Sequence, residues 1–300
     1  MNRMSGWRAL LVVWLLVCAA GVQAAGERLS LWEVTPTAGG ARGKVYLFGS
    51  IHVCGNVCYP LSGSITRRFE AAPALAVELD PLNPDVSARM MKEAQLPAGQ
   101  SLSDGMSSAE RRRYEQVMAR LGLPGEVLMS MKPWMAATVI TLMAAEREGY
   151  SATQGIDMWF VSRAREAGKR VLELETAERQ LAALTGGSEA EQMEQLRLAL
   201  QLVERNQMKP YFDRMRIAWQ RGDMAALDAV MTETMSGDSA WREALLDRRN
   251  EEMVVTLTQW LARGDTVFVV VGAGHMIGDK GLPALLAARG YKVRQIADGE

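Results

Sequence analysis

Two apolar stretches of the sequence end in the same way, and they contain the 2 histidines of the chain. Lys44–His52 (KVYLFGSIH) runs through β-forming residues to a glycine and then, three positions on, to His52. Thr266–His275 (TVFVVVGAGH) repeats this pattern and ends at His275. Ligands of parallel α/β sheets bind beyond the carboxyl ends of the strands. We therefore expect both imidazoles to meet at one site, with each glycine allowing the backbone to turn sharply.

The order of the other elements predicts an α/β fold. A helix over Leu61–Ala71 lies between the Lys44–His52 strand and a second apolar strand, Ala74–Leu79, which is the order of a parallel βαβ unit. Lys169–Glu175 reads as another strand, and Thr266–Val271 is apolar throughout, so it should be central. We expect a mixed or mostly parallel sheet formed by both chain ends. One domain, residues 25–300, would carry a large helical insertion at about residues 85–265.

The N-terminus has the pattern of a secretory signal peptide over residues 1–24. Arg3 and Arg8 precede the apolar run Ala9–Ala20, which is shorter than the roughly 20 residues of a membrane span. Small residues up to Ala24 suit cleavage there, and an uncleaved anchor is the alternative. We expect an exported, periplasmic protein with no membrane attachment after cleavage. The net charge of −1 gives no indication of nucleic-acid binding.

Two cysteines remain after the signal peptide, Cys54 and Cys58, just beyond His52. An even pair in an exported protein is typical of a disulfide. A metal-binding or redox pair is the alternative, and an oxidising compartment makes it the weaker one. A bridge here would mainly fix the loop that follows His52.

His52 and His275 are candidate ligands of a divalent metal, and Glu78 is the candidate third ligand. Neutral imidazole binds Zn²⁺, Mn²⁺ or Co²⁺. Glu78 ends an apolar strand, where an unpaired carboxylate is costly to bury. It could instead be a general base or part of an ordinary salt bridge. The alternation of side chains along a strand puts Asp80 on the same face as Glu78, so an exchange of roles between the two stays open.

Further polar residues have both a structural and a functional interpretation. Arg248, Arg249 and Asn250 lie in the middle of an expected helix, where a charge run usually faces solvent. Alternatively, Arg249 or Asn250 points into the site and stabilises an oxyanion. Asp157 could cap its helix or reach the site, and the capping role is slightly favoured.

These features together resemble the TraB/GumN family, which is similar to the TIKI proteases of animals, over nearly all of the mature chain. The paired Gly-x-x-His pattern is the specific part of the resemblance. The matching pieces are Leu47–Val53 (LFGSIHV), Tyr59–Leu61 (YPL), Glu78–Asp80 (ELD), Lys132–Trp134 (KPW), Gly155–Asp157 (GID), Leu172–Thr176 (LELET) with Gln180, Arg249–Asn250 (RN), and Val271–His275 (VGAGH) through Gly278 and Gly281–Leu282.

The resemblance implies a divalent-metal-dependent hydrolase, since TIKI members act as Mn²⁺- or Co²⁺-dependent peptidases. It also implies a fold similar to that of erythromycin esterases and haem-binding ChaN-like proteins. Carried over, His52, Glu78 and His275 form the metal site, and Arg249 and Asn250 support catalysis with Glu78 and His52.

The sequence therefore predicts an exported metallohydrolase that uses Mn, Co or Zn and cleaves peptide bonds near the end of a polypeptide. Two other classes of protein stay open. One is a periplasmic haem- or metal-binding protein without catalysis. The other is a metal-independent esterase with His52 as general base. The substrate, the native metal and the oligomeric state are not indicated by the sequence.

Overall fold

The computed structural model describes residues 28–37, 43–233 and 242–300. The predicted signal peptide therefore lies outside the described residues. The centre of the fold is a mixed six-stranded sheet in the order β4-β3-β5-β2-β1-β6. Strands β2 to β5 are parallel, and β1 is antiparallel to both β2 and β6. The strands are β1 (Arg28–Pro36), β2 (Lys44–Ser50), β3 (Ala74–Val77), β4 (Arg170–Glu173), β5 (Thr266–Gly272) and β6 (Tyr291–Ala297).

The predicted α/β class is confirmed, and the sheet draws strands from both ends of the chain. The expected central place of β5 is confirmed too, because it pairs with β2 on one side and β3 on the other. One edge strand, β4, comes from the middle of the chain. The predicted Lys44–His52 strand stops at Ser50, so His52 lies just beyond the sheet.

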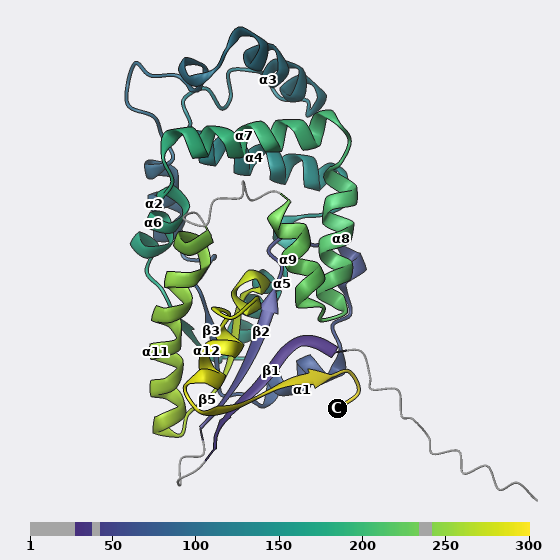
Figure 1. Ribbon diagram of the computed structural model, residues 1–300, viewed down its shortest axis with the longest axis vertical. Coiled ribbons are helices and arrows are strands. Elements are labelled where there is room, and N and C mark those ends of the chain that lie inside the picture. Colours follow the sequence, from purple (N-terminus) through teal and green to yellow (C-terminus); the bar gives the residue numbers. More distant parts are fainter. Residues whose placement is uncertain (1–27, 38–42, 234–241) are drawn as a thin grey trace, which may run out of the picture.

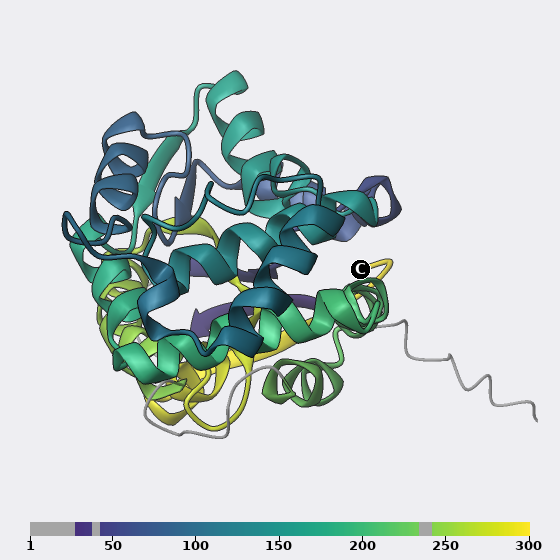
Figure 2. The same cartoon turned by 90° about the horizontal axis from the view of Figure 1, so that it is seen from above.

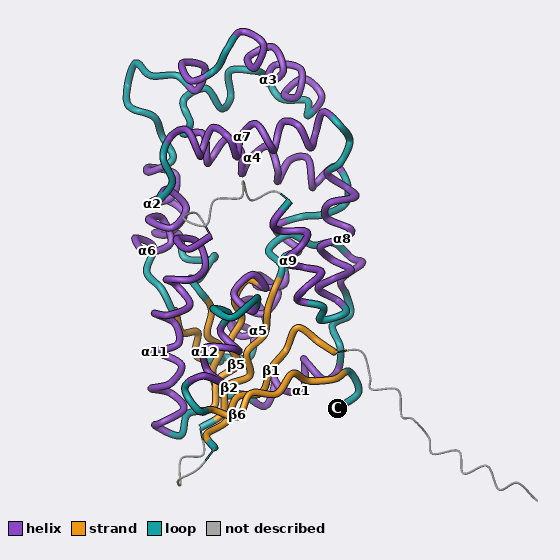
Figure 3. The backbone as a smooth tube through the Cα atoms, viewed as in Figure 1, coloured by secondary structure: helices purple, strands orange, loops and turns teal. Residues whose placement is uncertain are grey.

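Helices cover both faces of the sheet and extend well past one edge of it (Figures 1 and 3). A π-helical turn, Glu243–Asp247, leads into α11. The helices are α1 (Gly63–Ala71), α2 (Pro84–Glu93), α3 (Ser108–Arg120), α4 (Pro133–Arg147), α5 (Ile156–Glu166), α6 (Ala177–Thr185), α7 (Glu189–Glu204), α8 (Met208–Gln220), α9 (Met224–Thr232), α11 (Arg248–Arg263) and α12 (Leu282–Ala288).

Alternation along β5 explains how both faces of the sheet are buried. Phe268 and Val270 face a core shared with α1, α5 and α8, whereas Val267 and Val269 face a second core shared with α11 and α12. Successive side chains of a strand point to opposite faces, so an uninterrupted apolar run needs a helix layer on each side. The parallel strands are thus clamped between two helix layers, which fixes where their carboxyl ends lie.

A third apolar core lies away from the sheet and holds α3, α4 and α7 together with part of α8. In Figures 1 and 2, α4 and α7 run side by side across the carboxyl edge of the sheet, with α3 outermost. The helix starts follow the sequence signals, since Ser107 with Glu110 and Ser188 with Glu191 form capping boxes. No helix within the described ranges is long and apolar enough to cross a membrane.

We predict that Phe160→Ala lowers the free energy of unfolding by about 3–5 kcal/mol, the usual cost of removing a buried phenyl ring. Phe160 on α5 is fully buried, and its ring centroid lies 5.1 Å from that of Phe268 and 5.0 Å from that of Phe69. Urea unfolding followed by circular dichroism measures the change. Val255→Ala, at a 51% exposed position on α11, is the control and should stay within about 0.5 kcal/mol of wild type. A Phe160→Ala protein as stable as that control would contradict the packing described.

Candidate active site at the carboxyl edge of the sheet

Four polar residues follow the four parallel strands at one edge of the sheet. His52 comes after β2, Glu78 after β3, Glu175 after β4 and His275 after β5. The pairing register aligns Ser50 with Gly272, and Val77 with both Val270 and Glu173, so these strands end nearly level. The level ends bring together side chains that are far apart in the sequence.

The Glu78 carboxylate is buried at the centre of this group and makes contacts on both oxygens. Its Oε1 accepts a hydrogen bond of 2.6 Å from the backbone N–H of Gly272 and lies 3.5 Å from His275 Nε2. Its Oε2 accepts a hydrogen bond from the Arg249 guanidinium. Burial raises the pKa of Glu78, but His275, Arg249 and His52 together outweigh it and hold the pKa well below its usual range.

The tautomer of His275 is set by its partner on α11. The Asn250 side-chain amide donates to the Lys280 carbonyl at 2.8 Å, so its oxygen is the atom that faces His275 Nδ1 at 2.6 Å. An amide oxygen only accepts, so His275 Nδ1 must carry a proton. In the neutral ring, the lone pair of Nε2 then faces the carboxylate oxygen of Glu78. A proton or a cation between these two acceptors is needed to make the contact favourable.

His52 approaches the same place from the solvent side. Its Nδ1 lies 3.1 Å from Asp157 Oδ1, near the start of α5, and its side chain is 62% exposed. The position that a Cβ would take on Gly272 lies 3.1 Å from His52 Nε2 and 3.3 Å from Glu78 Oε1. His52 Nε2 and Glu78 Oε1 therefore border the same space beside Gly272, which a side chain at that position would fill.

The negative charge of Asp157 is the main cause of a raised pKa at His52, which reaches about 9. The loss of hydration opposes the shift, whereas the hydrogen bond to Asp157 and the charge of Glu78 add to it. His52 is therefore an imidazolium at neutral pH as long as no metal competes for Nε2. Because 62% of the His52 side chain is exposed, solvent screens the ion pair with Asp157, and its contribution to stability is small.

Arg249 is held between two carboxylates inside the protein. Its Nε and a terminal nitrogen donate to Glu175 at 2.7 and 2.6 Å, and its other terminal nitrogen donates to the Leu245 carbonyl at 2.7 Å. Glu78, Glu175 and Asp157 carry three negative charges against the single positive charge of Arg249. With both imidazoles neutral the group has a formal charge of −2, which two protons or one divalent cation would balance.

The chain matches the model of the TraB/PrgY/gumN family over residues 30–295. The chain belongs to the TraB/PrgY/gumN family. Two relatives are the uncharacterized protein YbaP of Escherichia coli (strain K12) and that of Shigella flexneri. Each is 28% identical over 244 residues, which cover 80% of this chain and 87% of the relative. No solved structure matches the chain.

Several residues predicted from the sequence of this TraB/PrgY/gumN protein are brought together, and others are not. Arg249 and Asn250 are buried beside Glu78 and His275, whereas Arg248 lies on the surface and pairs with Glu243. Asp80 faces away and binds Arg165 at 2.6 Å. It does not share a face with Glu78, because β3 ends at Val77 and the alternation stops there.

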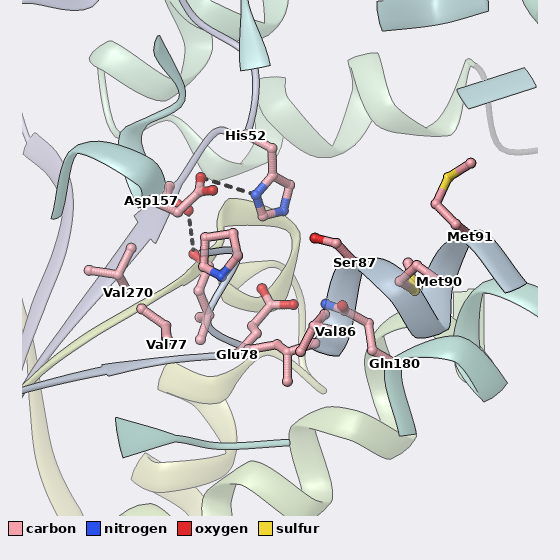
Figure 4. A pocket seen from close by; sticks show the side chains of 14 residues that line it. His52, Val77, Glu78, Val86, Ser87, Met90, Met91, Asp157, Gln180 and Val270 are labelled. Carbon is pink, nitrogen blue, oxygen red and sulfur yellow. Dashed lines mark hydrogen bonds and ion pairs between the residues drawn. The ribbon is translucent and has the colours of Figure 1, made fainter. Parts of the chain in front are cut away.

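The structure corrects the interpretation of Asp157 and of the glycines. The α5 helix begins after Gly155 without a side-chain cap, and Asp157 binds His52 instead (Figure 4). Gly155 has no room for a side chain, since a Cβ would lie 2.3 Å from the His52 carbonyl oxygen, and this close approach brings Asp157 to the imidazole. Gly49 and Gly272 do not have positive φ angles, so they provide space rather than a sharp turn.

The sequence did not single out Glu175 as a site residue. Its side chain is 1% exposed, and it binds Arg249. The one sequence feature that could have identified Glu175 is its position just after an apolar strand. Glu78 was chosen on that same feature. The predicted disulfide between Cys54 and Cys58 is present. The loop is also tied by two backbone hydrogen bonds between Cys54 and Ser151, so the chain beyond His52 is fixed at both ends.

The donor set is of a kind that binds divalent metals, because two imidazoles and a carboxylate gather at one edge of the sheet. Each ligating histidine of a metal site usually donates its other N–H to an oxygen, and Asp157 and Asn250 supply such oxygens to His52 and His275. Across the described ranges no three His, Cys, Asp or Glu side chains stand close enough to hold an ion as they are placed.

We predict that Nδ1 of His275 keeps its proton in wild-type protein and that Asn250→Ala removes the hydrogen bond that fixes it. With 2 histidines in the chain, a ¹⁵N-histidine NMR spectrum of untagged protein contains two ring systems. The His275 nitrogen and proton shifts should change in the variant, while those of His52 serve as the internal control. An unprotonated Nδ1 in wild-type His275 would contradict the assigned tautomer.

We predict that the ring of His52 in chelator-treated protein titrates near pH 9, and that Asp157→Asn returns its pKa toward the ordinary 6.5. A pKa raised on folding stabilises the protein fully below the unfolded value, and the contribution is lost as the pH rises through the folded value. The stability difference between wild type and Asp157→Asn should thus be present below about pH 6.5 and vanish above about pH 9. NMR titration and urea unfolding at several pH values measure the two effects. A difference that grows with pH would reverse the assignment.

Proposed function

We propose that this protein is an exported, divalent-metal-dependent hydrolase that cleaves peptide bonds. The observation that carries the proposal is the gathering of two histidines and a buried carboxylate at the carboxyl edge of parallel strands. His275 Nε2 contacts Glu78 Oε1, and His52 Nε2 borders the same space beside Gly272. Each ring has its Nδ1 held by an oxygen, which is how proteins orient histidine ligands. Membership of the TraB/PrgY/gumN family and its resemblance to TIKI proteases support this choice. A fold akin to that of erythromycin esterases, ChaN-like proteins and TIKI proteases is part of the same proposal.

In this proposal His52, His275 and Glu78 hold the metal, which can be Mn, Co or Zn. Bound there, the ion would supply a Lewis acid that activates water and polarises the scissile carbonyl. The lowered pKa of Glu78 makes its carboxylate a weak proton acceptor, which favours a ligand over a general base. Hydrolysis adds one water across the amide C–N bond and gives a carboxylate and an amine.

Arg249 and Asn250 act in the proposal through the ligands rather than on the substrate. The three nitrogens of the Arg249 guanidinium already donate to Glu78, Glu175 and a backbone carbonyl, so it holds Glu78 in place. The Asn250 side chain is also fully engaged, since its amide nitrogen donates to the Lys280 carbonyl and its oxygen accepts from His275. Both are positioning residues, and the exposed ring of His52 is the member of the site that meets solvent and substrate.

The two other classes of protein make different predictions. A periplasmic haem-binding protein would give a Soret band on haem titration that depends on His52 or His275. A metal-independent esterase would keep its activity in the presence of a chelator. The excess negative charge around Glu78 favours a small divalent cation over a large planar ligand, because a cation balances it at close range.

We predict that untagged protein binds one Mn²⁺, Co²⁺ or Zn²⁺, and that His275→Ala and Glu78→Gln each weaken binding by more than about 100-fold. Asn250→Ala should weaken it by about 10- to 100-fold, the usual effect of losing the group that orients a ligand. Binding should strengthen as the pH rises toward 9, because the metal displaces the proton of His52. Isothermal titration calorimetry with each metal measures affinity and proton release.

Asp80→Asn is the matched control, since Asp80 lies two positions from Glu78 but faces Arg165. Its metal affinity and its activity should equal those of wild type. Digestion of a peptide library in each metal, with wild type and Glu78→Gln compared by mass spectrometry, tests the hydrolase itself. Identical product lists from the two proteins would reject the peptidase proposal.

A further inference from the structure

Two cavities meet at the candidate site. One has a volume of about 370 Å³ and the other about 350 Å³, each within the range of sites that enclose a small ligand. Ser50, His52 and Glu78 line both of them. The two cavities therefore adjoin at the site and lie on either side of it, and together they are called the groove here.

The two sides of the groove come from different elements. The first, here the α2 arm, is lined by Leu79, Pro81, Val86, Met90 and Met91. The second, here the α8–α9 arm, is lined by Phe212, Met215, Leu227, Met231 and Leu246. In Figure 1, α2 stands on one side of the sheet edge and α8 and α9 on the other. A substrate that reaches both arms must cross the site between them.

Charged groups line only the middle of this groove. In the part of the chain that the structure describes, the charged lining residues are His52, Glu78 and Asp157 on the α2 side, with Arg249 and His275 on the other. All five belong to the site itself. Among the described residues, neither arm is lined by a carboxylate that could bind a terminal ammonium or by a cation that could bind a terminal carboxylate. A peptide that lies here would thus continue past each arm rather than end in it.

Two polar side chains on the α2 side are suited to bind a peptide backbone. Gln180 on α6 extends its amide toward the Glu78 carboxylate, and the Ser87 hydroxyl on α2 faces the same space (Figure 4). Neither side chain makes a hydrogen bond within the described residues. An amide side chain both donates and accepts, as a peptide group does, so Gln180 can hold the substrate main chain beside Glu78.

We propose that the groove binds an extended internal segment of a polypeptide, with one apolar side chain in the α2 arm and another in the α8–α9 arm. The bond between those two residues then lies over His52 and Glu78. Methionine side chains adapt to different apolar shapes, so the groove selects apolar character rather than one residue type. This inference rests on the proposed peptidase function. It differs from the sequence-based expectation of cleavage near a chain end, because here the side chains on either side of the bond determine where cleavage occurs.

Binding of peptides to the chelator-treated protein tests the groove without requiring hydrolysis. The probes are four fluorescein-labelled hexapeptides, capped at both ends, whose central pair is Leu–Leu, Leu–Asp, Asp–Leu or Asp–Asp. We expect fluorescence anisotropy to show that Leu–Leu binds at least about tenfold more tightly than either single-Asp peptide, because each arm buries one apolar side chain. Equal binding of all four peptides would overturn the inference.

Introducing a lysine into each arm in turn and testing the Asp-containing peptides distinguishes the two arms. Met91→Lys on the α2 arm and Met215→Lys on the α8–α9 arm should each improve binding of one single-Asp peptide, and the improved peptide should differ between the variants. Gln180→Leu should weaken all four peptides to a similar extent, because it removes a contact with the main chain. Val127→Lys, at a 48% exposed position outside both cavities, is the control and should bind like wild type. The same improved peptide in both Lys variants would contradict two separate arms.

Hydrolysis of the same peptides in metal-loaded protein separates this inference from the proposed function. Tight Leu–Leu binding without cleavage in any metal would reject the peptidase function but retain the groove. Cleavage that does not depend on the central pair, or that requires an uncapped end, would reject the groove but retain the peptidase function.

Discussion

The burial of the Glu78 carboxylate is the constraint on which the site depends. A carboxylate in the interior is tolerated only when hydrogen bonds and opposite charge replace its water. Here the replacement comes from the Gly272 backbone N–H, from Arg249 on α11 and from the ring of His275. The groups that satisfy Glu78 therefore tie the ends of β3 and β5 and the start of α11 to one point.

The same contacts give the site its chemical character. Arg249 alone does not neutralise the formal negative charges of Glu78, Glu175 and Asp157, and Asp157 in particular raises the pKa of His52. Asn250 and Asp157 orient the two rings through their Nδ1 atoms. The 62% exposure of His52 leaves one side of this charge open to solvent, whereas His275 is shielded. A buried His275 beside an exposed His52 is an arrangement in which an incoming molecule can reach the site.

Much of this could be read from the sequence, for identifiable physical reasons. The apolar runs of β2, β3 and β5 predicted buried parallel strands, and residues that follow such strands must gather at one edge. Capping boxes at Ser107 and Ser188 were also readable, because they depend on contacts within a few residues. For Asp157 the sequence slightly favoured a local cap over a role in the site, because its partner, His52, is remote in the sequence. The direction of Asp80 was missed because it depends on where β3 ends.

The role of Glu175 shows the limit of reading side chains one at a time. Its carboxylate matters because Arg249 lies between it and Glu78, and only the relative placement of α11 and the sheet reveals that. The two apolar arms of the groove could likewise not be predicted from the sequence. Methionine, leucine and phenylalanine at these positions look like ordinary core residues until the helices that carry them are seen to stand apart across the sheet edge.

The central place of β5 has a consequence for how the chain acquires its structure. This strand is the fifth of the six described strands in chain order, yet it lies between β2 and β3, so these two earlier strands are joined only when β5 enters between them. Pairings between distant segments form slowly. The candidate site therefore stays incomplete until β5 enters the sheet, because His275 follows directly on that strand.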